Sequence, residues 1–323
     1  MPINIPDGLP AKKILHDEHI FALEEEVAAR QQIRPLRVVL LNLMPTKIET
    51  ETQILRLISK SPLQVSLDFM RVSSHEATHS RDHLVKFYET FDILKANNYD
   101  GLIVTGAPVE QMPFEDVDYW KELTEIFDWA DEHVLSTMHL CWGAMAKLYY
   151  KYGIHKIDLP EKLFGVFPQR LCDEYSFLTN GFDELHYMPH SRHAMLDEAE
   201  LRLHPELQVL SEGITSGPAI IATKDFHEIY LTGHFEYGRD TLASEYWRDA
   251  NAGKPIKLPV NYFPGDDPTY QPRFTWRAHA NLLYRNWLNW VYQMTPYRFE
   301  DIPETVVDLK RHAHPGTVDK FEV

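Results

Sequence analysis

The sequence predicts an α/β fold with a mainly parallel sheet and helices on both faces. Continuous apolar runs at residues 37–43, 102–105 and 134–140 have the composition of strands buried on both sides. Each run leads into a stretch with helical periodicity, and this alternation is typical of parallel sheets. Because parallel strands end at one edge of a sheet, we expect the residues that follow these runs to lie close together.

Other elements follow from the same patterns, and the weakest signal lies in the middle of the chain. Strands are expected at 37–43, 64–72, 102–105 and 134–140, and helices at 48–60, 82–96, 117–130, 241–252 and 279–293. Residues 155–215 are less regular, and we interpret them as an insertion or an antiparallel addition. The neighbouring runs PAIIATKD and HEIYLTGH predict a hairpin.

We expect three parts along the chain: an N-terminal arm (1–35) packed on the core, a single catalytic domain (36–300) and a C-terminal tail (301–323). The arm contains a charged helical stretch at 16–32. The tail is charged and contains Pro, a composition typical of disordered termini. The arm and the aromatic-rich helix near 279–293 are candidate contacts of a homodimer.

Composition excludes several classes of function. The 323 residues carry a net charge of −16, which repels a phosphate backbone and so disfavours nucleic-acid binding. Two cysteines cannot form a disulfide scaffold, and they fit a reducing compartment. No apolar run approaches the ~20 residues of a membrane span, and the N-terminus lacks the apolar core of a signal peptide. We therefore expect a cytoplasmic protein that does not bind membranes.

Cys141 is the strongest candidate for chemistry. It stands between the strand at 134–140 and the helical run CWGAMAKLYY. A residue at such a turn is exposed above the sheet, and the positive end of the following helix favours its thiolate. The alternative is a structural Cys buried in a core strand.

His234 and Glu236 can complete a catalytic triad with Cys141. Both follow an apolar run in LTGHFEY, and they lie two residues apart, on one face if the strand continues. A nucleophilic Cys needs a base, and the base needs an orienting group. The alternatives are polar residues at a strand end, or metal ligands. No third ligand stands at suitable spacing, so we expect no metal and no cofactor.

The pattern Cys-x-Gly with a distant His-x-Glu resembles class I glutamine amidotransferases, although His139 stands where those enzymes usually have Gly. A closer resemblance is to the homoserine O-acyltransferase family of methionine biosynthesis. It rests on LNLMPTK, GLIVTGAP, CWGA, PHSRH, LTGHFEY, NYFPGDDP and WRAHANLLYRNWLN, in this order. The chain has HFEY where HPEY is common and WRAHAN where WRSHGN is common, and neither departure removes a reactive group.

The resemblance implies an amidotransferase-like fold and a ping-pong acyl transfer. Cys141 would attack the thioester of acyl-CoA and hold the acyl group, and homoserine's hydroxyl would then attack that group. His234 would act as general base and Glu236 would orient it. The backbone N–H of Trp142 is suited to the oxyanion, with a second donor from the Gly106–Pro108 turn region. Lys47 can add positive charge there, unless it is an ordinary solvated lysine.

Family positions also suggest which residues bind the substrates. Lys162, Ser191 and Arg248 match positions that bind substrate, and an Arg suits the carboxylate of L-homoserine. Glu110 matches a position that tends to be Glu in acetyl-transferring members and Gly in succinyl-transferring ones. A carboxylate there repels the distal carboxylate of succinyl-CoA, so we expect acetyl-CoA as donor.

Alternatives remain at this stage. The donor could be succinyl-CoA, and the acceptor could be serine, because one methylene gives only modest discrimination. A Cys-dependent amidohydrolase, either a glutaminase or a peptidase, would use the same triad and pass the acyl group to water. A binding protein without activity would have an unreactive Cys141. The sequence assigns no role to Cys172.

Overall fold

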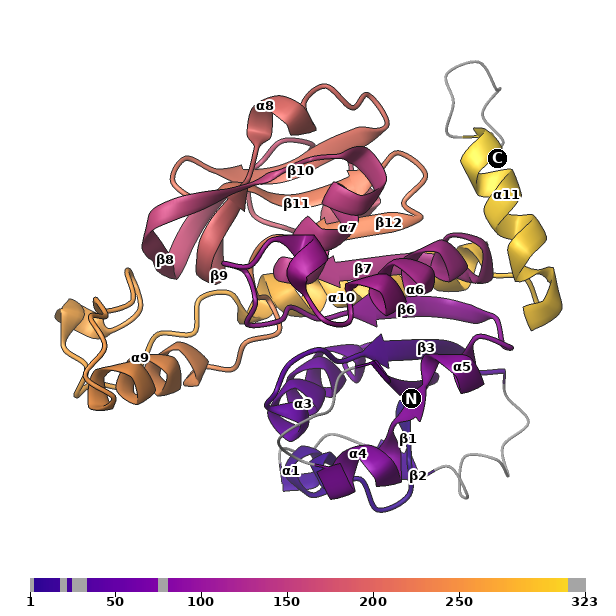
Figure 1. Cartoon of the computed structure of the whole chain (residues 1–323), viewed down its shortest axis with the longest axis horizontal. Coiled ribbons are helices and arrows are strands. Elements are labelled where there is room, and N and C mark those ends of the chain that lie inside the picture. The colour runs from indigo at the N-terminus through magenta and orange to yellow at the C-terminus, as the bar shows by residue number, and fades with distance from the viewer. Residues whose placement is uncertain (1–2, 18–21, 25–33, 75–80, 313–323) are drawn as a thin grey trace.

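The computed structural model describes residues 3–17, 22–24, 34–74 and 81–312, and its strands form one mixed sheet (Figure 1). The order is β2-β1-β4-β3-β6-β7-β12-β11-β10-β8-β9, with β5 beside β4. The strands are β1 (Ile3–Ile5), β2 (Ala22–Glu24), β3 (Leu36–Leu41), β4 (Val65–Arg71), β5 (Glu89–Thr90), β6 (Tyr99–Val104), β7 (Val134–Leu140), β8 (Lys156–Leu171), β9 (Leu185–Leu196), β10 (Leu207–Gly213), β11 (Gly217–Thr223) and β12 (Glu228–Leu231). Pairing is parallel from β2 through β12 and antiparallel from β12 to β9, which confirms the predicted fold class.

Helices cover both faces of the parallel part. They are α1 (Ala11–Asp17), α3 (Lys47–Ile58), α4 (Arg81–Phe87), α5 (Phe91–Leu94), α6 (Trp120–His133), α7 (Trp142–Tyr152), α8 (Glu198–Leu201), α9 (Thr241–Asn251), α10 (Arg277–Met294) and α11 (Ile302–His312). Alternate residues of β3 face opposite sides, as a pleated strand requires. Val38 and Leu40 pack with α3 and α10, whereas Val39 and Leu41 pack with α6 and α7.

Three segments differ from the sequence-based expectation. The helix predicted over 82–96 is divided into α4 and α5, because the extended residues between them pair with β4. Residues 155–215 contain the long antiparallel strands β8, β9 and β10 rather than irregular chain. The start of the predicted tail forms α11, whose Ile302 and Val306 are buried.

The predicted arm is only partly described. Its residues 22–24 form β2 rather than part of a helix, while β1 pairs with β4 and so joins the arm to the sheet. Residues 18–21 and 25–33 of the arm, and 313–323 of the tail, lie outside the described residues.

Buried ion pairs fix the position of α7, the helix that follows Cys141. Glu228 at the start of β12 is fully buried and pairs with Lys147 and Lys151 of α7, at 3.1 and 2.9 Å. Burial alone would raise the pKa of Glu228, but the two lysines hold it well below its usual range. Both lysines also contact Asp131 of α6, whose carbonyl accepts a hydrogen bond from Lys310 of α11.

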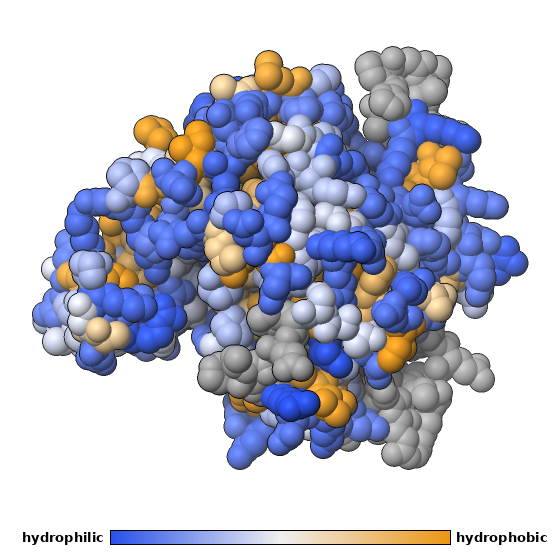
Figure 2. Space-filling view, in the orientation of Figure 1, coloured by the Kyte–Doolittle hydropathy of each residue, from blue (hydrophilic) through white to orange (hydrophobic). Residues whose placement is uncertain are grey.

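The three central strands β6, β7 and β12 are neighbours, so their carboxyl ends meet at one edge of the sheet. Gly143 lets α7 approach that edge closely, because a Cβ there would lie 2.7 Å from the Thr105 carbonyl oxygen. The side of the molecule shown in Figure 2 is mostly hydrophilic, with small scattered apolar patches. In the described part of the chain, no helix combines the length and the apolar character that crossing a membrane requires.

Candidate active site

Cys141 lies at a strained turn between β7 and α7. Its φ of 48° and ψ of −113° are rare for a residue with a side chain, and such a conformation costs about 1–3 kcal/mol. The Cys141 N–H donates to the Leu231 carbonyl at 2.6 Å, which ties the turn to β12. The side chain is 4% exposed. The sequence-based prediction of a sharp strand-to-helix turn therefore matches the local geometry, whereas the expectation of an exposed Cys141 side chain was wrong, because the turn is buried.

A small space beside Cys141 is bounded by the first amide of α7 and by Gly106. A Cβ at Gly106 would lie 3.4 Å from the Cys141 Cβ and 3.7 Å from the Trp142 nitrogen. The first N–H groups of a helix have no partner within the helix, so the Trp142 N–H is available to an incoming oxygen. This arrangement suits a developing oxyanion.

His234 and Glu236 form a hydrogen-bonded pair, with 2.6 Å between Nδ1 and Oε1. Both lie in the turn that follows β12 rather than on a continued strand, and the His234 N–H donates to the Pro189 carbonyl at 2.8 Å. Burial alone would lower the pKa of His234. The Cys141 sulfur and Glu236, both hydrogen-bonded to the ring, instead raise that pKa well above its usual value. The His234 imidazole therefore favours its protonated form beside the Cys141 sulfur.

Tyr237 joins this triad to a second polar cluster and was missed at the sequence level. Its ring stacks on the His234 ring with centroids 4.1 Å apart. Its hydroxyl donates to Glu245 Oε1 at 2.9 Å. The available signal was its place in HFEY, one residue after Glu236.

Glu245 on α9, also missed, is where two of the predicted substrate-binding residues meet. Ser191 donates to Glu245 Oε2 at 2.5 Å, and the Lys162 ammonium lies 3.2 Å from the same oxygen. Arg248, one turn further along α9, does not join them. Its guanidinium is 65% exposed and forms an ion pair with Asp249 at 3.0 Å.

Glu110 lies near a buried cation, Arg192, which sequence reasoning did not single out. Glu110 Oε1 accepts a hydrogen bond from the His193 N–H at 3.2 Å. Arg192 is 1% exposed and donates to the carbonyls of Ala194 and Ser216. Burial lowers the pKa of Arg192 to about 10, while the charges of Cys141 and Glu110 oppose that shift. The charges of these two groups therefore help to stabilise the buried guanidinium.

Lys47 is buried at the start of α3, and its ammonium donates to the Asn42 carbonyl at 2.7 Å. Burial lowers the pKa of Lys47 to about 8, against a raising effect of Glu51. The side chain lines a cavity together with Pro108. It is therefore not the ordinary solvated lysine that the sequence also allowed.

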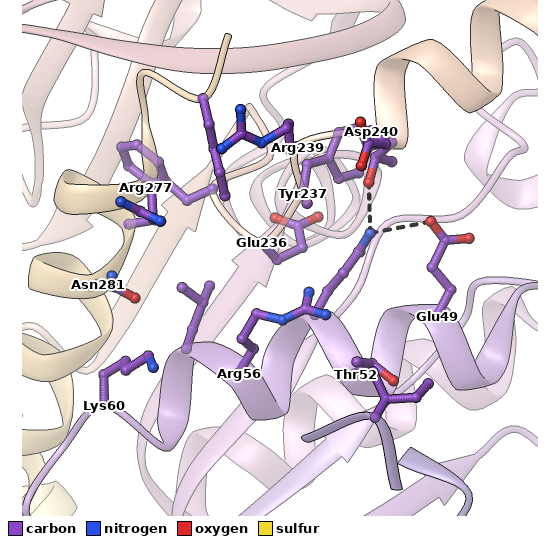
Figure 3. Close-up of a pocket in the computed structure, with 18 of the residues that line it drawn as sticks. Glu49, Thr52, Arg56, Lys60, Glu236, Tyr237, Arg239, Asp240, Arg277 and Asn281 are labelled. Atoms are coloured by element: carbon purple, nitrogen blue, oxygen red, sulfur yellow. Dashed lines mark hydrogen bonds between the residues drawn. The ribbon is translucent and has the colours of Figure 1, made fainter. Parts of the chain in front are cut away.

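A separate cavity of about 580 Å³ lies against Glu236 and Tyr237 (Figure 3). Arg56, Arg239 and Arg277 also line it, and Gln53 donates hydrogen bonds at its rim to Glu49 and Thr241. Within the described residues, no group of three or more His, Cys, Asp or Glu side chains is arranged to hold a metal ion.

Comparison with known proteins places this chain in a family. A family model described as homoserine O-succinyltransferase matches residues 2–297. A protein of Bifidobacterium adolescentis named homoserine O-acetyltransferase is 64% identical over 94% of this chain and 89% of its own length. A protein of the same name from Clostridium acetobutylicum is 54% identical over 92% of this chain and 99% of its own.

A solved structure from Thermoplasma acidophilum, assigned to one of the subunits of GMP synthase, covers 87% of this chain and 100% of its own, with a TM-score of 0.51 and 10% identity. At that identity the likeness concerns the fold alone, and it agrees with the amidotransferase-like architecture expected from the sequence. The family model and the two relatives, in contrast, extend over nearly the full length. The chain therefore belongs to the homoserine O-succinyltransferase family.

Proposed function

We propose that the chain is a homoserine O-acetyltransferase of methionine biosynthesis, which moves the acetyl group of acetyl-CoA to the hydroxyl of L-homoserine through a Cys141 thioester. One observation carries the proposal: a hydrogen-bonded Cys141–His234–Glu236 triad lies in a chain 64% identical to a relative of that name. We expect the enzyme to act in the cytoplasm without a cofactor. The division into arm (1–35), catalytic domain (36–300) and tail (301–323), and the homodimer, remain predictions.

In the first half-reaction, the Cys141 sulfur attacks the carbonyl carbon of acetyl-CoA after its proton has passed to His234. The negative charge moves to the carbonyl oxygen, which the Trp142 N–H can stabilise. The bond between carbon and the CoA sulfur then breaks, and CoA leaves with the proton from His234. Exchanging one thioester for another is nearly balanced in energy, so the leaving group needs little assistance.

In the second half-reaction, the hydroxyl of homoserine gives its proton to His234 and attacks the acetyl group on Cys141. The bond between the acetyl carbon and Cys141 breaks, which releases O-acetylhomoserine and restores the thiolate–imidazolium pair. Glu236 stabilises the charged imidazole in both halves, at a hydrogen-bond distance of 2.6 Å.

We assign the acceptor site to the cluster around Glu245. Its carboxylate suits the ammonium group of homoserine, and Lys162 beside it suits the carboxylate. Ser191 and Tyr237 hold the Glu245 side chain, and Tyr237 also stacks on the catalytic imidazole. Arg248 can contribute only if its guanidinium leaves Asp249, which its 65% exposure permits. Serine is one methylene shorter and would place its hydroxyl further from Cys141.

We assign the choice of acyl donor to the balance between Glu110 and Arg192. The Glu110 carboxylate offsets the buried charge of Arg192 and would repel a second carboxylate on the acyl chain. The acetyl group is small and uncharged, so it tolerates this environment. Succinyl-CoA remains the alternative donor. Its distal carboxylate could pair with Arg192 only if Glu110 did not offset the positive charge of that guanidinium.

The first test is CoA release by the purified protein, given acetyl-CoA or succinyl-CoA with homoserine, with serine or with no acceptor. We expect release from acetyl-CoA that requires homoserine, and an acetyl group on the peptide that contains Cys141 when homoserine is omitted. Equal release with and without an acceptor would identify a hydrolase and contradict the transferase. Cys141→Ser serves as the inactive control.

Replacing Glu236 with Gln should weaken the nucleophile. The change removes a charge that raises the pKa of His234, so less thiolate–imidazolium pair exists at neutral pH. We expect alkylation of Cys141 by iodoacetamide at pH 7 to slow about tenfold, equivalent to one pKa unit, and kcat to fall at least about a hundredfold. Mass spectrometry separates Cys141 from the exposed Cys172, which should react unchanged and is the internal control. An unaltered Cys141 rate would contradict the role of Glu236.

Replacing Glu245 with Gln should affect the acceptor alone. Loss of the carboxylate removes the partner of the homoserine ammonium, so KM for homoserine should rise at least about tenfold. Acetylation of Cys141 in the absence of homoserine should proceed as in the parent protein. Glu161→Gln, which alters an exposed carboxylate paired with Lys257, is the matched control. An equal loss in both half-reactions would argue against an acceptor site at Glu245.

Replacing Glu110 with Gly should broaden the donor range. Without that carboxylate, the buried charge of Arg192 can attract the distal carboxylate of succinyl-CoA. We expect the ratio of kcat/KM for succinyl-CoA to that for acetyl-CoA to increase at least about tenfold. Glu115→Gly, on a nearby exposed acid, should leave the ratio unchanged and controls for general effects of charge. An unchanged ratio in Glu110→Gly would remove Glu110 from donor choice.

A further inference from the structure

We propose that the cavity at the carboxyl ends of β3, β4 and β6 binds the pantetheine arm and the phosphates of the acyl donor. This inference rests on the proposed function, because it takes a CoA thioester as the donor. The cavity has a volume of about 710 Å³, within the range of about 300–1,000 Å³ typical of small-molecule sites.

Two residues that line the cavity connect it through the chain to the proposed oxyanion site. Pro108 and Val109, which line it, closely follow Gly106, and the Gly106 position is in van der Waals reach of the Cys141 Cβ. Lys47 also lines the cavity, with its ammonium fixed on the Asn42 carbonyl. A thioester with its carbonyl beside the Trp142 N–H would therefore have its leaving sulfur next to this cavity.

The walls of the cavity suit a long, mostly aliphatic arm. Apolar side chains from three separate segments line it: Leu43, Met44, Pro45, Val72, Val109 and Met112. Pantetheine combines methylene groups with two amides, so it buries apolar area in such a channel without leaving a charge unpaired.

Two arginines supply the positive charge that phosphates require. Arg71, at the end of β4, has a buried Nε with no hydrogen-bond partner, and neither it nor Arg81 has an ion pair among the described residues. Asp116 and Asp118 also line the cavity, and Asp118 already has a partner of its own. Guanidinium groups bind phosphate oxygens in a bidentate manner, so Arg71 and Arg81 mark where the phosphates would lie.

The cavity of Figure 3 is the competing location, and the observations favour it less. It also carries arginines, but Arg56 already has a partner and Arg239 donates to the Pro272 carbonyl. It lies against Glu236, and none of its described lining residues comes from the Gly106–Pro108 turn. Arg277, which lines it and stacks on Phe274, provides the matched control.

The test compares Arg71→Gln with Arg277→Gln in the full-length chain. We expect Arg71→Gln to raise the KM for acetyl-CoA and the Kd for CoA, measured by calorimetry, about tenfold, with kcat changed less than about twofold. The KM for S-acetylpantetheine, which lacks the phosphate groups, should not change. Arg277→Gln should match the parent protein. Increases in Arg277→Gln instead, or equal increases for both donors in Arg71→Gln, would overturn the proposal.

A second variant guards against a folding defect in Arg71→Gln. Val85 lines the cavity and is 74% exposed, so Val85→Glu should fold normally and repel the phosphates, raising the Kd for CoA at least about threefold. An unchanged Kd in both variants would overturn the site. Failure of the proposed function is a separate result: the protein would bind CoA through Arg71 yet not acetylate homoserine.

Discussion

The architecture of the site depends on one strained turn. Cys141 has a backbone conformation that a side chain disfavours, and its N–H is bonded to the Leu231 carbonyl of the adjacent strand. That bond requires β7 and β12 to be parallel neighbours in register, which the flanking β6 and the antiparallel β11 maintain. Buried ion pairs hold the other end of α7 through Glu228. The fold thus stabilises a backbone conformation of Cys141, the proposed nucleophile, that the local sequence alone would not hold in place.

Much of the catalytic centre could be predicted because its residues stand where apolar runs end. Cys141 directly follows a run whose limits, 134–140, match β7, and His234 follows the run that contains β12. The middle of the chain could not be predicted as well. Only five of the 16 residues of β8 are buried, so it lacks the continuous apolar pattern of the central strands. His234 and Glu236 would share a strand face only if the strand continued, and β12 ends at Leu231.

Residues whose contacts lie far away in the sequence could not be predicted, for a different reason. Glu245 meets Ser191 and Lys162, which are 54 and 83 positions away, and nothing in α9 itself indicates those partners. Arg192 looks like a polar loop residue in PHSRH, but β9 buries it completely. A sequence pattern gives the hydrophobic period of a single helix or strand. The contacts of Glu245 and Arg192 instead arise from the packing of several elements.

The stacking of Tyr237 on His234 has a consequence for the timing of the cycle. The His234 ring is hydrogen-bonded to the Glu236 carboxylate and stacked on the Tyr237 ring, and these two contacts fix its position. The same imidazole, in the same place, must then accept a proton from the thiol and later from the alcohol. On the proposed mechanism, acetyl-CoA and homoserine therefore react one after the other beside a single fixed base, His234. The acetyl group would then stay on Cys141 until homoserine occupies the place that CoA has left.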